Sequence, residues 1–283
     1  MPTTLPSRKI TAPVFFVLAI YLVCLALRIF EYFVLRTDAT VLGENIFHKL
    51  AGIVILFAVA RYLSYSPARI GFTKDFSGLL WGACFGLAFF AVAYLSEVLI
   101  LRASFERLDF YVSSYSVTGN FGMHKEAAFF LICIAGNIIN VVMEEGVFRG
   151  LFQKILEEKH GFLTAGIFAS LLFGLWHAIG PVQSYFDGDS NARQMTANLI
   201  LLVTTSSLVG FKYLLLDKLS GALYMGMADH FVNNTIINIL HVLDAGGADK
   251  LQVVRISIAQ SLSFVAVLIF FVLSRSKNKQ KQH

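Results

Sequence analysis

Charged residues and cysteine are scarce in this sequence. Only 14% of its 283 residues are Asp, Glu, Lys or Arg, whereas 57% are hydrophobic, and the mean hydropathy is +0.69. This composition argues against a soluble domain and fits a polytopic helical membrane protein. The three cysteines, Cys24, Cys84 and Cys133, lie inside apolar runs. They therefore indicate small core residues rather than a disulfide framework or a CxxC metal pair.

The formal net charge of +5 does not indicate a nucleic-acid partner, because the basic residues are spread along the loops with one cluster at the C-terminus. We interpret them as topology signals. With a cytoplasmic N-terminus, the inner segments carry 13 Lys/Arg and the outer loops carry eight. This bias predicts that both termini are cytoplasmic. We expect the protein to be surrounded by membrane lipid, in the plasma membrane if it is prokaryotic or in the endoplasmic reticulum if it is eukaryotic.

Eight apolar segments predict an all-α bundle of about eight transmembrane helices. Spans of about 20 residues would account for about 160 residues and leave short loops. We expect a turn at Gly119-Asn120-Phe121-Gly122 and a disordered basic tail over 274–283. Gly180-Pro181 is expected to stop the fifth helix, and a polar loop to follow it through Arg193. The catalytic core is expected at 125–240, between segments 1–124 and 241–283 of one integrated membrane domain. The predicted helices are 14–34, 46–62, 79–101, 125–159, 162–178, 197–216, 222–240 and 256–273.

Some polar and small residues inside these helices have a structural interpretation. Glycine at 78, 82 and 86 gives one face of its helix a close approach to a neighbour, and Gly166, Ser170 and Gly174 form a second such stripe. Arg28 and Glu31 are spaced i,i+3 and predict an internal ion pair. Glu97 lies near a helix end, where its side chain can snorkel.

The segment Asn137–Gly150 carries two adjacent carboxylates at the end of an apolar run. Ionised side chains at membrane depth are costly, face a protein interior or a cavity, and are usually functional. Adjacent helical residues are about 100° apart around the axis, so Glu144 and Glu145 cannot form a facing dyad. Glu145 and Arg149 have the i,i+4 order of an ion pair. Glu144, on the stripe of Asn140, is then available for chemistry.

Three further polar residues lie on predicted helices. His177 ends Phe173-Gly174-Leu175-Trp176-His177, while His230 and Asn234 are spaced i,i+4 and share a face. Each alone is compatible with a packing role. Together with Glu144 they favour a hydrolase, in which a carboxylate activates water and His and Asn side chains donate to an oxyanion. The HExxH, Gly-x-Ser-Gly and Gly-x-Gly-Asp motifs of other membrane proteases are absent from the sequence.

In this order, Glu144-Glu145-x-x-x-Arg149, Phe173-x-x-x-His177 and His230-x-x-x-Asn234 resemble the CPBP family of intramembrane proteases, over roughly residues 125–240. This family contains the CAAX-prenyl endopeptidases and the bacterial Abi proteins. The resemblance implies that Glu144 and His177 activate the attacking water and that His230 and Asn234 stabilise the oxyanion. It also implies that Glu145, Arg149 and Phe173 support the site.

Several alternatives stay open. Glu144, His177 and His230 could ligate zinc, but Arg149 would disfavour a dication and Asn is a poor zinc ligand, so we favour a mechanism without a cofactor. A non-catalytic immunity or scaffold protein and a proton-coupled transporter are the rival functions. No inverted repeat supports the transporter. The expected substrate is a peptide or lipidated protein, and the sequence leaves its identity and the oligomeric state open.

Overall fold

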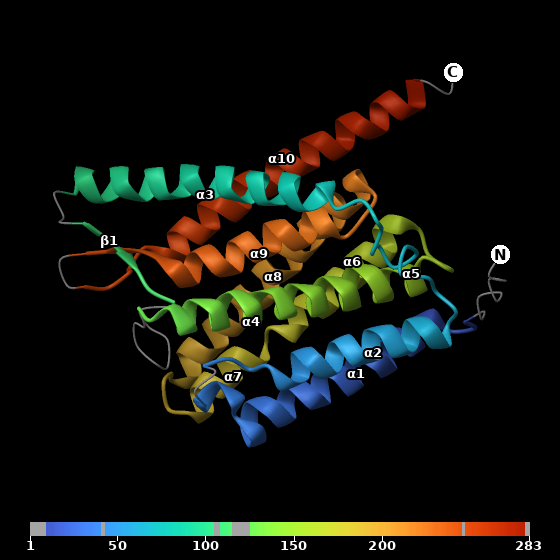
Figure 1. Ribbon diagram of the computed structural model, residues 1–283, viewed down its shortest axis with the longest axis horizontal. Coiled ribbons are helices and arrows are strands. Elements are labelled where there is room, and N and C mark those ends of the chain that lie inside the picture. Colours follow the sequence, from blue (N-terminus) through green and yellow to red (C-terminus); the bar gives the residue numbers. More distant parts are fainter. Residues whose placement is uncertain (1–9, 41–42, 105–107, 115–124, 245–246, 281–283) are drawn as a thin grey trace. The chain divides into compact units, whose positions relative to one another are not determined.

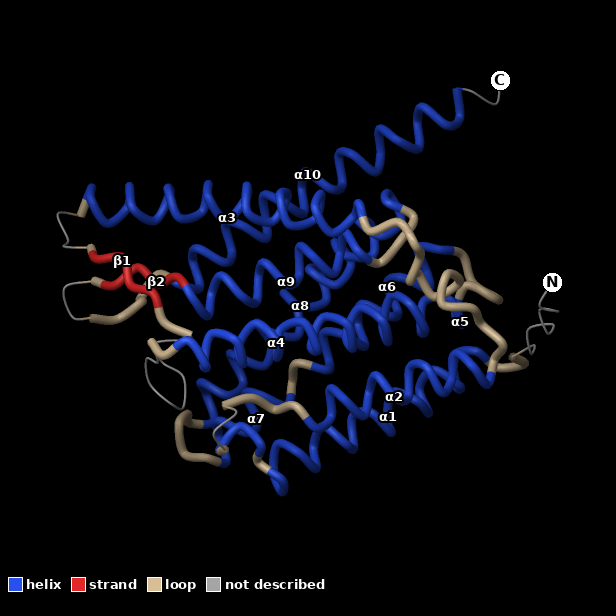
Figure 2. The backbone as a smooth tube through the Cα atoms, viewed as in Figure 1, coloured by secondary structure: helices blue, strands red, loops and turns tan. Residues whose placement is uncertain are grey.

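The computed structural model of the protein describes residues 10–40, 43–104, 108–114, 125–244 and 247–280 (Figure 1). The turn expected at 119–122 lies outside them. Helices dominate the described residues and confirm the all-α class, with one short two-stranded sheet in addition (Figure 2). The chain forms two compact units. Unit 1 comprises Met1–Asp75 and Ile139–Leu223, and unit 2 comprises Phe76–Ile138 and Tyr224–His283.

Unit 1 contains most of the helices. Its first part is α1 with two short continuations and α2, and its second part starts within α4 and ends after α8. In Figure 1, α1 and α2 run side by side. The elements are α1 (Pro13–Phe30), the π-helix η1 (Glu31–Leu35), the 3₁₀-helix η2 (Thr37–Ala39), α2 (Phe47–Tyr62), α4 (Ala127–Glu145), the π-helix η3 (Gly146–Phe152), α5 (Gln153–Leu156), α6 (Phe162–Trp176), α7 (Ile179–Phe186) and α8 (Ala192–Ser220).

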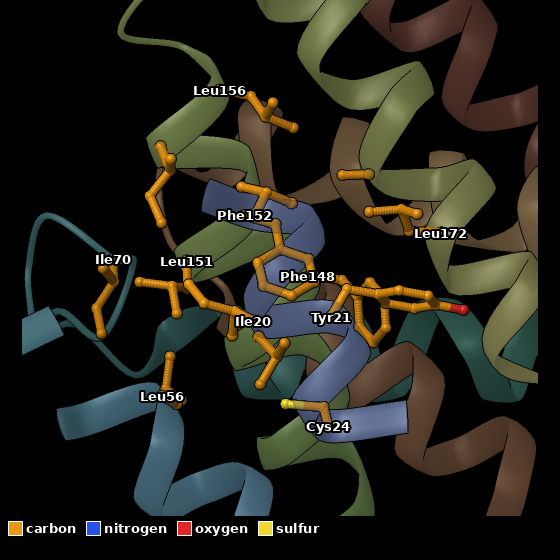
Figure 3. Close-up of a cluster of buried hydrophobic side chains, with 14 of the residues drawn as sticks. Ile20, Tyr21, Cys24, Leu56, Ile70, Phe148, Leu151, Phe152, Leu156 and Leu172 are labelled. Atoms are coloured by element: carbon orange, nitrogen blue, oxygen red, sulfur yellow. The ribbon is translucent and has the colours of Figure 1, made fainter. Parts of the chain in front are cut away.

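The core of unit 1 is an apolar cluster around η3. Phe148 lies beside Tyr21 in this cluster (Figure 3), and their ring centroids are 6.4 Å apart. The Phe148 ring centroid also lies 5.9 Å from that of Trp176. Leu151 and Phe152 follow on the same segment and are fully buried. Aromatic pairs at these separations add to the stabilisation that burial provides. The core therefore fixes η3, and with it the end of α4 that carries Glu144.

The small-residue stripe of α6 makes the predicted close contact, and its partner is α8. A Cβ added at Gly174 would collide with the Val203 carbonyl oxygen, so this position requires glycine, and one added at Gly166 would contact the end of the Leu214 side chain. The predicted polar loop after α6 is wrong in part, since Ile179–Phe186 forms α7. Pro181 does not stop this helix, because it lies in the first turn, where a backbone N–H has no intrahelical acceptor.

Unit 2 is organised around α3 (Ser77–Ala103), α9 (Tyr224–Ile239) and α10 (Gln252–Gln280). The glycine face of α3 packs on α9 as predicted: a Cβ at Gly82 would lie 2.9 Å from the Ala228 Cβ, and one at Gly86 would lie 2.8 Å from Asp229 Oδ1. Strands β1 (Asp109–Val112) and β2 (Leu240–Leu243) pair antiparallel. The predicted disordered tail is wrong up to Gln280, because no Gly or Pro interrupts the Lys-rich end of α10.

Six helical segments among the described residues are long and apolar enough to cross a membrane. They confirm an integral membrane protein with several spans. α2 and α9 have 16 residues each and are shorter than the typical span, so the total of about eight stays a prediction. The six segments are Pro13–Ala39, Ser77–Ala103, Ala127–Leu156, Phe162–Phe186, Ala192–Ser220 and Gln252–Ser276.

Candidate active site

Glu144 lies one residue before the end of α4 and is 3% exposed. Its Oε1 accepts a hydrogen bond from Trp176 Nε1 at 3.1 Å, and its Oε2 accepts one from Asn140 Nδ2 at 3.2 Å. The predicted stripe shared by Asn140 and Glu144 is therefore present. Trp176 belongs to α6, so this hydrogen bond connects the candidate spans that contain α4 and α6. The sequence analysis gave Trp176 no role.

A cation also faces Glu144, which the sequence analysis did not anticipate. Nη1 of Arg28, on α1, lies 3.9 Å from Glu144 Oε1, and both side chains are buried. The guanidinium of Arg28 is centred 4.5 Å from the Trp176 ring and 4.9 Å from that of Tyr32, whose hydroxyl accepts a hydrogen bond from Nη2 at 3.0 Å.

The predicted Arg28–Glu31 ion pair is also wrong. Glu31 continues the α-helical turn of α1 and starts the π-helix η1, in which the N–H of Arg36 bonds the Glu31 carbonyl. The Glu31 carboxylate instead accepts hydrogen bonds from the His48 ring, the Thr37 hydroxyl and two backbone N–H groups that start α2. The Glu31 carboxylate therefore binds the N-terminus of α2, and the Arg28 guanidinium faces Glu144 instead.

Glu145 and Arg149 form the predicted i,i+4 ion pair, with Arg149 Nε 3.3 Å from Glu145 Oε2. Arg149 also donates to the Gly210 carbonyl at 3.2 Å, and its guanidinium is centred 4.0 Å from the Phe173 ring. These contacts connect the end of α4 and η3 with α6 and α8. The pair is buried, and its contacts differ from those of Glu144.

His177 immediately follows α6 and is half-buried. Its Nδ1 lies 2.8 Å from the Phe173 carbonyl oxygen, which can only accept, so Nδ1 carries a proton and donates. The rings of Phe173 and His177 meet edge to face at 4.7 Å. Phe173 therefore orients His177 through both its backbone and its ring. Because α7 continues the candidate span to Phe186, His177 lies inside that span rather than at its end.

The other two predicted site residues belong to unit 2. His230 is 5% exposed on α9, and Asn234 follows one turn later. Asn234 accepts a hydrogen bond from Asn233 Nδ2 at 2.9 Å, and its carbonyl accepts one from Asn238. Asp229, which the sequence analysis missed, is 2% exposed beside Gly86 of α3. The sequence feature that could have indicated Asp229 is a carboxylate directly before His230 in an apolar run.

Unit 2 also corrects the interpretation of Glu97. Instead of snorkelling, Glu97 is 1% exposed and paired with Arg255, which also contacts Asp249. His241 Nδ1 of β2 lies 3.4 Å from Asp249 Oδ2. Burial favours the neutral acid, but the hydrogen bonds from His241 and Arg255 outweigh it and lower the pKa of Asp249 below 3.8. This cluster connects α3, β2 and α10.

The candidate zinc ligands are divided between the units, with Glu144 and His177 in unit 1 and His230 in unit 2. No group of three His, Cys, Asp or Glu side chains suited to a metal ion occurs among the described residues. The donor set is a poor fit for a dication, since Glu144 already accepts from two side chains and has Arg28 at 3.9 Å. The sequence analysis expected Arg149 to disfavour a dication, whereas in the structure Arg28 is the arginine that faces Glu144.

Several long apolar helices place this protein in the class of polytopic membrane proteins. Residues 126–236, from before Glu144 to beyond Asn234, match the family model of the type II CAAX prenyl endopeptidase Rce1-like proteins. The chain is also similar to "Putative membrane peptidase YdiL" of Bacillus subtilis (strain 168), with 29% identity over 131 residues. That match covers 46% of this chain and 51% of the relative, so the chain spans about half the length of that protein. These findings confirm the resemblance to the CPBP family of membrane proteases over this part of the chain.

Proposed function

We propose that this protein is an intramembrane endopeptidase in which Glu144 activates a water molecule. The observation that carries the proposal is a buried carboxylate on a candidate membrane span, inside the matched segment, held by two neutral donors with a cation nearby. A nearby cation and hydrogen-bond donors favour the ionised form of a carboxylate. Ionised Glu144 has the charge that a general base requires.

In the proposed reaction, Glu144 accepts a proton from water as the water oxygen attacks the carbonyl carbon of the substrate. His177 directs this water through Nε2, because Nδ1 donates to Phe173. The tetrahedral oxyanion accepts hydrogen bonds from His230 and Asn234. The proton on Glu144 then passes to the amide nitrogen as the C–N bond breaks.

The proposed mechanism is independent of metal. Arg28 faces the carboxylate that would have to bind zinc, and the repulsion between a guanidinium and a dication opposes that site. The proposed substrate is a membrane-associated or lipidated peptide, since the matched family model is named for prenyl endopeptidases. A prenyl chain would partition into the lipid surrounding the candidate spans and bring the peptide to the depth of Glu144.

The test uses the purified protein in detergent and a quenched-fluorescence peptide with a farnesylated C-terminal CAAX sequence. Glu144→Gln keeps the size of the side chain but removes the base, so kcat should fall about 10²–10⁴-fold in a folded protein. His177→Ala should cause a loss that does not add to it, and Asn234→Ala should cost about 10²–10³-fold. Glu126→Gln, at the exposed start of α4, is the matched control.

Each alternative has a separate outcome. Full cleavage by Glu144→Gln would refute the assignment of the base. Loss of cleavage on chelation, its return with zinc, and about one zinc per chain would identify a zinc protease instead. A scaffold would not cleave, and Glu144→Gln would leave its biological protection or partner binding intact.

A further inference from the structure

Arg28 lies outside the matched segment 126–236, yet its Nη1 lies 3.9 Å from Glu144 Oε1. Its guanidinium does not rely on Glu31, because that carboxylate is bound to His48, Thr37 and the start of α2. Instead it lies near the faces of Trp176 and Tyr32 and donates to the Tyr32 hydroxyl. A buried arginine held in this way has few alternative positions, so its charge stays beside Glu144.

The second observation concerns the oxygen that Arg28 faces. Glu144 Oε1 is the acceptor for Trp176 Nε1 and is also the oxygen 3.9 Å from Arg28 Nη1. Arg28 and Trp176 thus act on one oxygen from α1 and α6, while Asn140 of α4 holds the other. An ionised carboxylate is a stronger acceptor than a protonated one, so the cation and the indole hydrogen bond strengthen each other.

We propose that Arg28 is a positioning residue of the peptidase site, which holds the Glu144 carboxylate ionised and oriented against Trp176. This inference rests on the proposed function, because it assigns Arg28 to the base of that reaction. It acts through Glu144 and not on the substrate. A cation supplied by α1 would make the N-terminal helix part of the active site, rather than a hydrophobic segment attached to it.

The experiment compares Arg28→Met with Arg28→Lys in the full-length protein. Methionine retains much of the apolar volume and removes the charge, whereas lysine keeps the charge. For Arg28→Met we expect a loss in kcat on the order of 10²-fold with KM little changed, since a poorly oriented or protonated base affects the chemical step. Arg28→Lys should recover a large part of kcat. Arg61→Met, which removes an exposed cation at the end of α2, should leave kcat unchanged.

A spectroscopic measurement tests the same contact without any substrate. The chain has two tryptophans, and Trp81 is 65% exposed on α3, so Trp81→Phe leaves Trp176 as the only reporter. Ultraviolet resonance Raman spectroscopy reports the hydrogen-bond strength of its indole N–H. In this background, Arg28→Met should weaken the bond in the same direction as Glu144→Gln, Arg28→Lys should preserve it, and Arg61→Met should not change it.

The outcomes separate the inference from the function on which it rests. If the parent protein does not cleave the peptide but the indole bond responds to Arg28→Met, the proposed function is refuted and the hold of Arg28 on Glu144 is supported. If the protein cleaves, but folded Arg28→Met has an unchanged kcat and indole bond, the inference is overturned. Equal losses of kcat and thermal stability in Arg28→Met and Arg28→Lys would also overturn it, because they indicate packing alone.

Discussion

The buried Glu145–Arg149 pair makes a quantitative prediction about stability. The side chains of Glu145 and Arg149 are 0% and 2% exposed, and the guanidinium also binds the Gly210 carbonyl and packs on Phe173. Removing one partner of a buried pair typically destabilises a protein by about 3–5 kcal/mol, because the other charge stays buried without compensation. We expect Arg149→Ala to lower the free energy of unfolding in detergent by about this amount, and to reduce the yield of folded protein.

The matched control is the Arg69–Glu158 pair, which has a similar separation of 3.2 Å in the same unit. The Arg69 and Glu158 side chains are 39% and 19% exposed, so Arg69→Ala should cost only about 0–1 kcal/mol. The double substitution Arg149→Met with Glu145→Gln removes both charges and should be more stable than Arg149→Ala. Equal unfolding free energies for Arg149→Ala and Arg69→Ala would refute the argument from burial.

Two further predictions concern unit 2. Because the pKa of Asp249 is lowered below 3.8, its ionised form stabilises the fold above about pH 4, and this contribution is lost as pH falls further. The thermal midpoint should therefore drop on acidification in the parent protein and drop less in Asp249→Asn; equal slopes would contradict this. Gly82→Leu should disrupt the α3–α9 contact and lower the thermal midpoint, because even a Cβ at this position overlaps Met225 and Ala228. Gly161→Ala has open space around the new methyl group and is the control, so an equal effect of the two would exclude close packing as the cause.

Local and periodic features of the sequence predicted much of the fold. Apolar runs predicted the long helices, and glycine spaced by four residues predicted the faces on which α3 meets α9 and α6 meets α8. The i,i+4 spacing predicted both the Glu145–Arg149 pair and the contact of Asn140 with Glu144. In each case the partner lies within one helix, or the pattern repeats along it.

The contacts that sequence reasoning missed join residues distant in the chain. Arg28 has a closer candidate partner in Glu31, but the Glu31 carboxylate is bound to Thr37, His48 and the start of α2 instead. Glu97 similarly pairs with Arg255, which is 158 residues away. Periodicity carries no information on such pairs. β1 and β2 were missed for the same reason, since each has only four residues and its partner lies across α4–α9 in sequence.

The two adjacent glutamates show how one helical step separates a structural carboxylate from a chemical one. Glu145 is held by an arginine on its own helical segment at 3.3 Å, and that arginine is anchored by a backbone carbonyl and an aromatic ring. Glu144 faces Arg28 at the longer distance of 3.9 Å and accepts hydrogen bonds from the neutral donors Trp176 and Asn140. A general base must gain and lose a proton in every cycle, and a carboxylate already engaged in a close, anchored ion pair is less available for that task. The longer separation of Glu144 from its arginine makes it the better candidate for the proposed reaction, whereas the contacts of Glu145 support the fold.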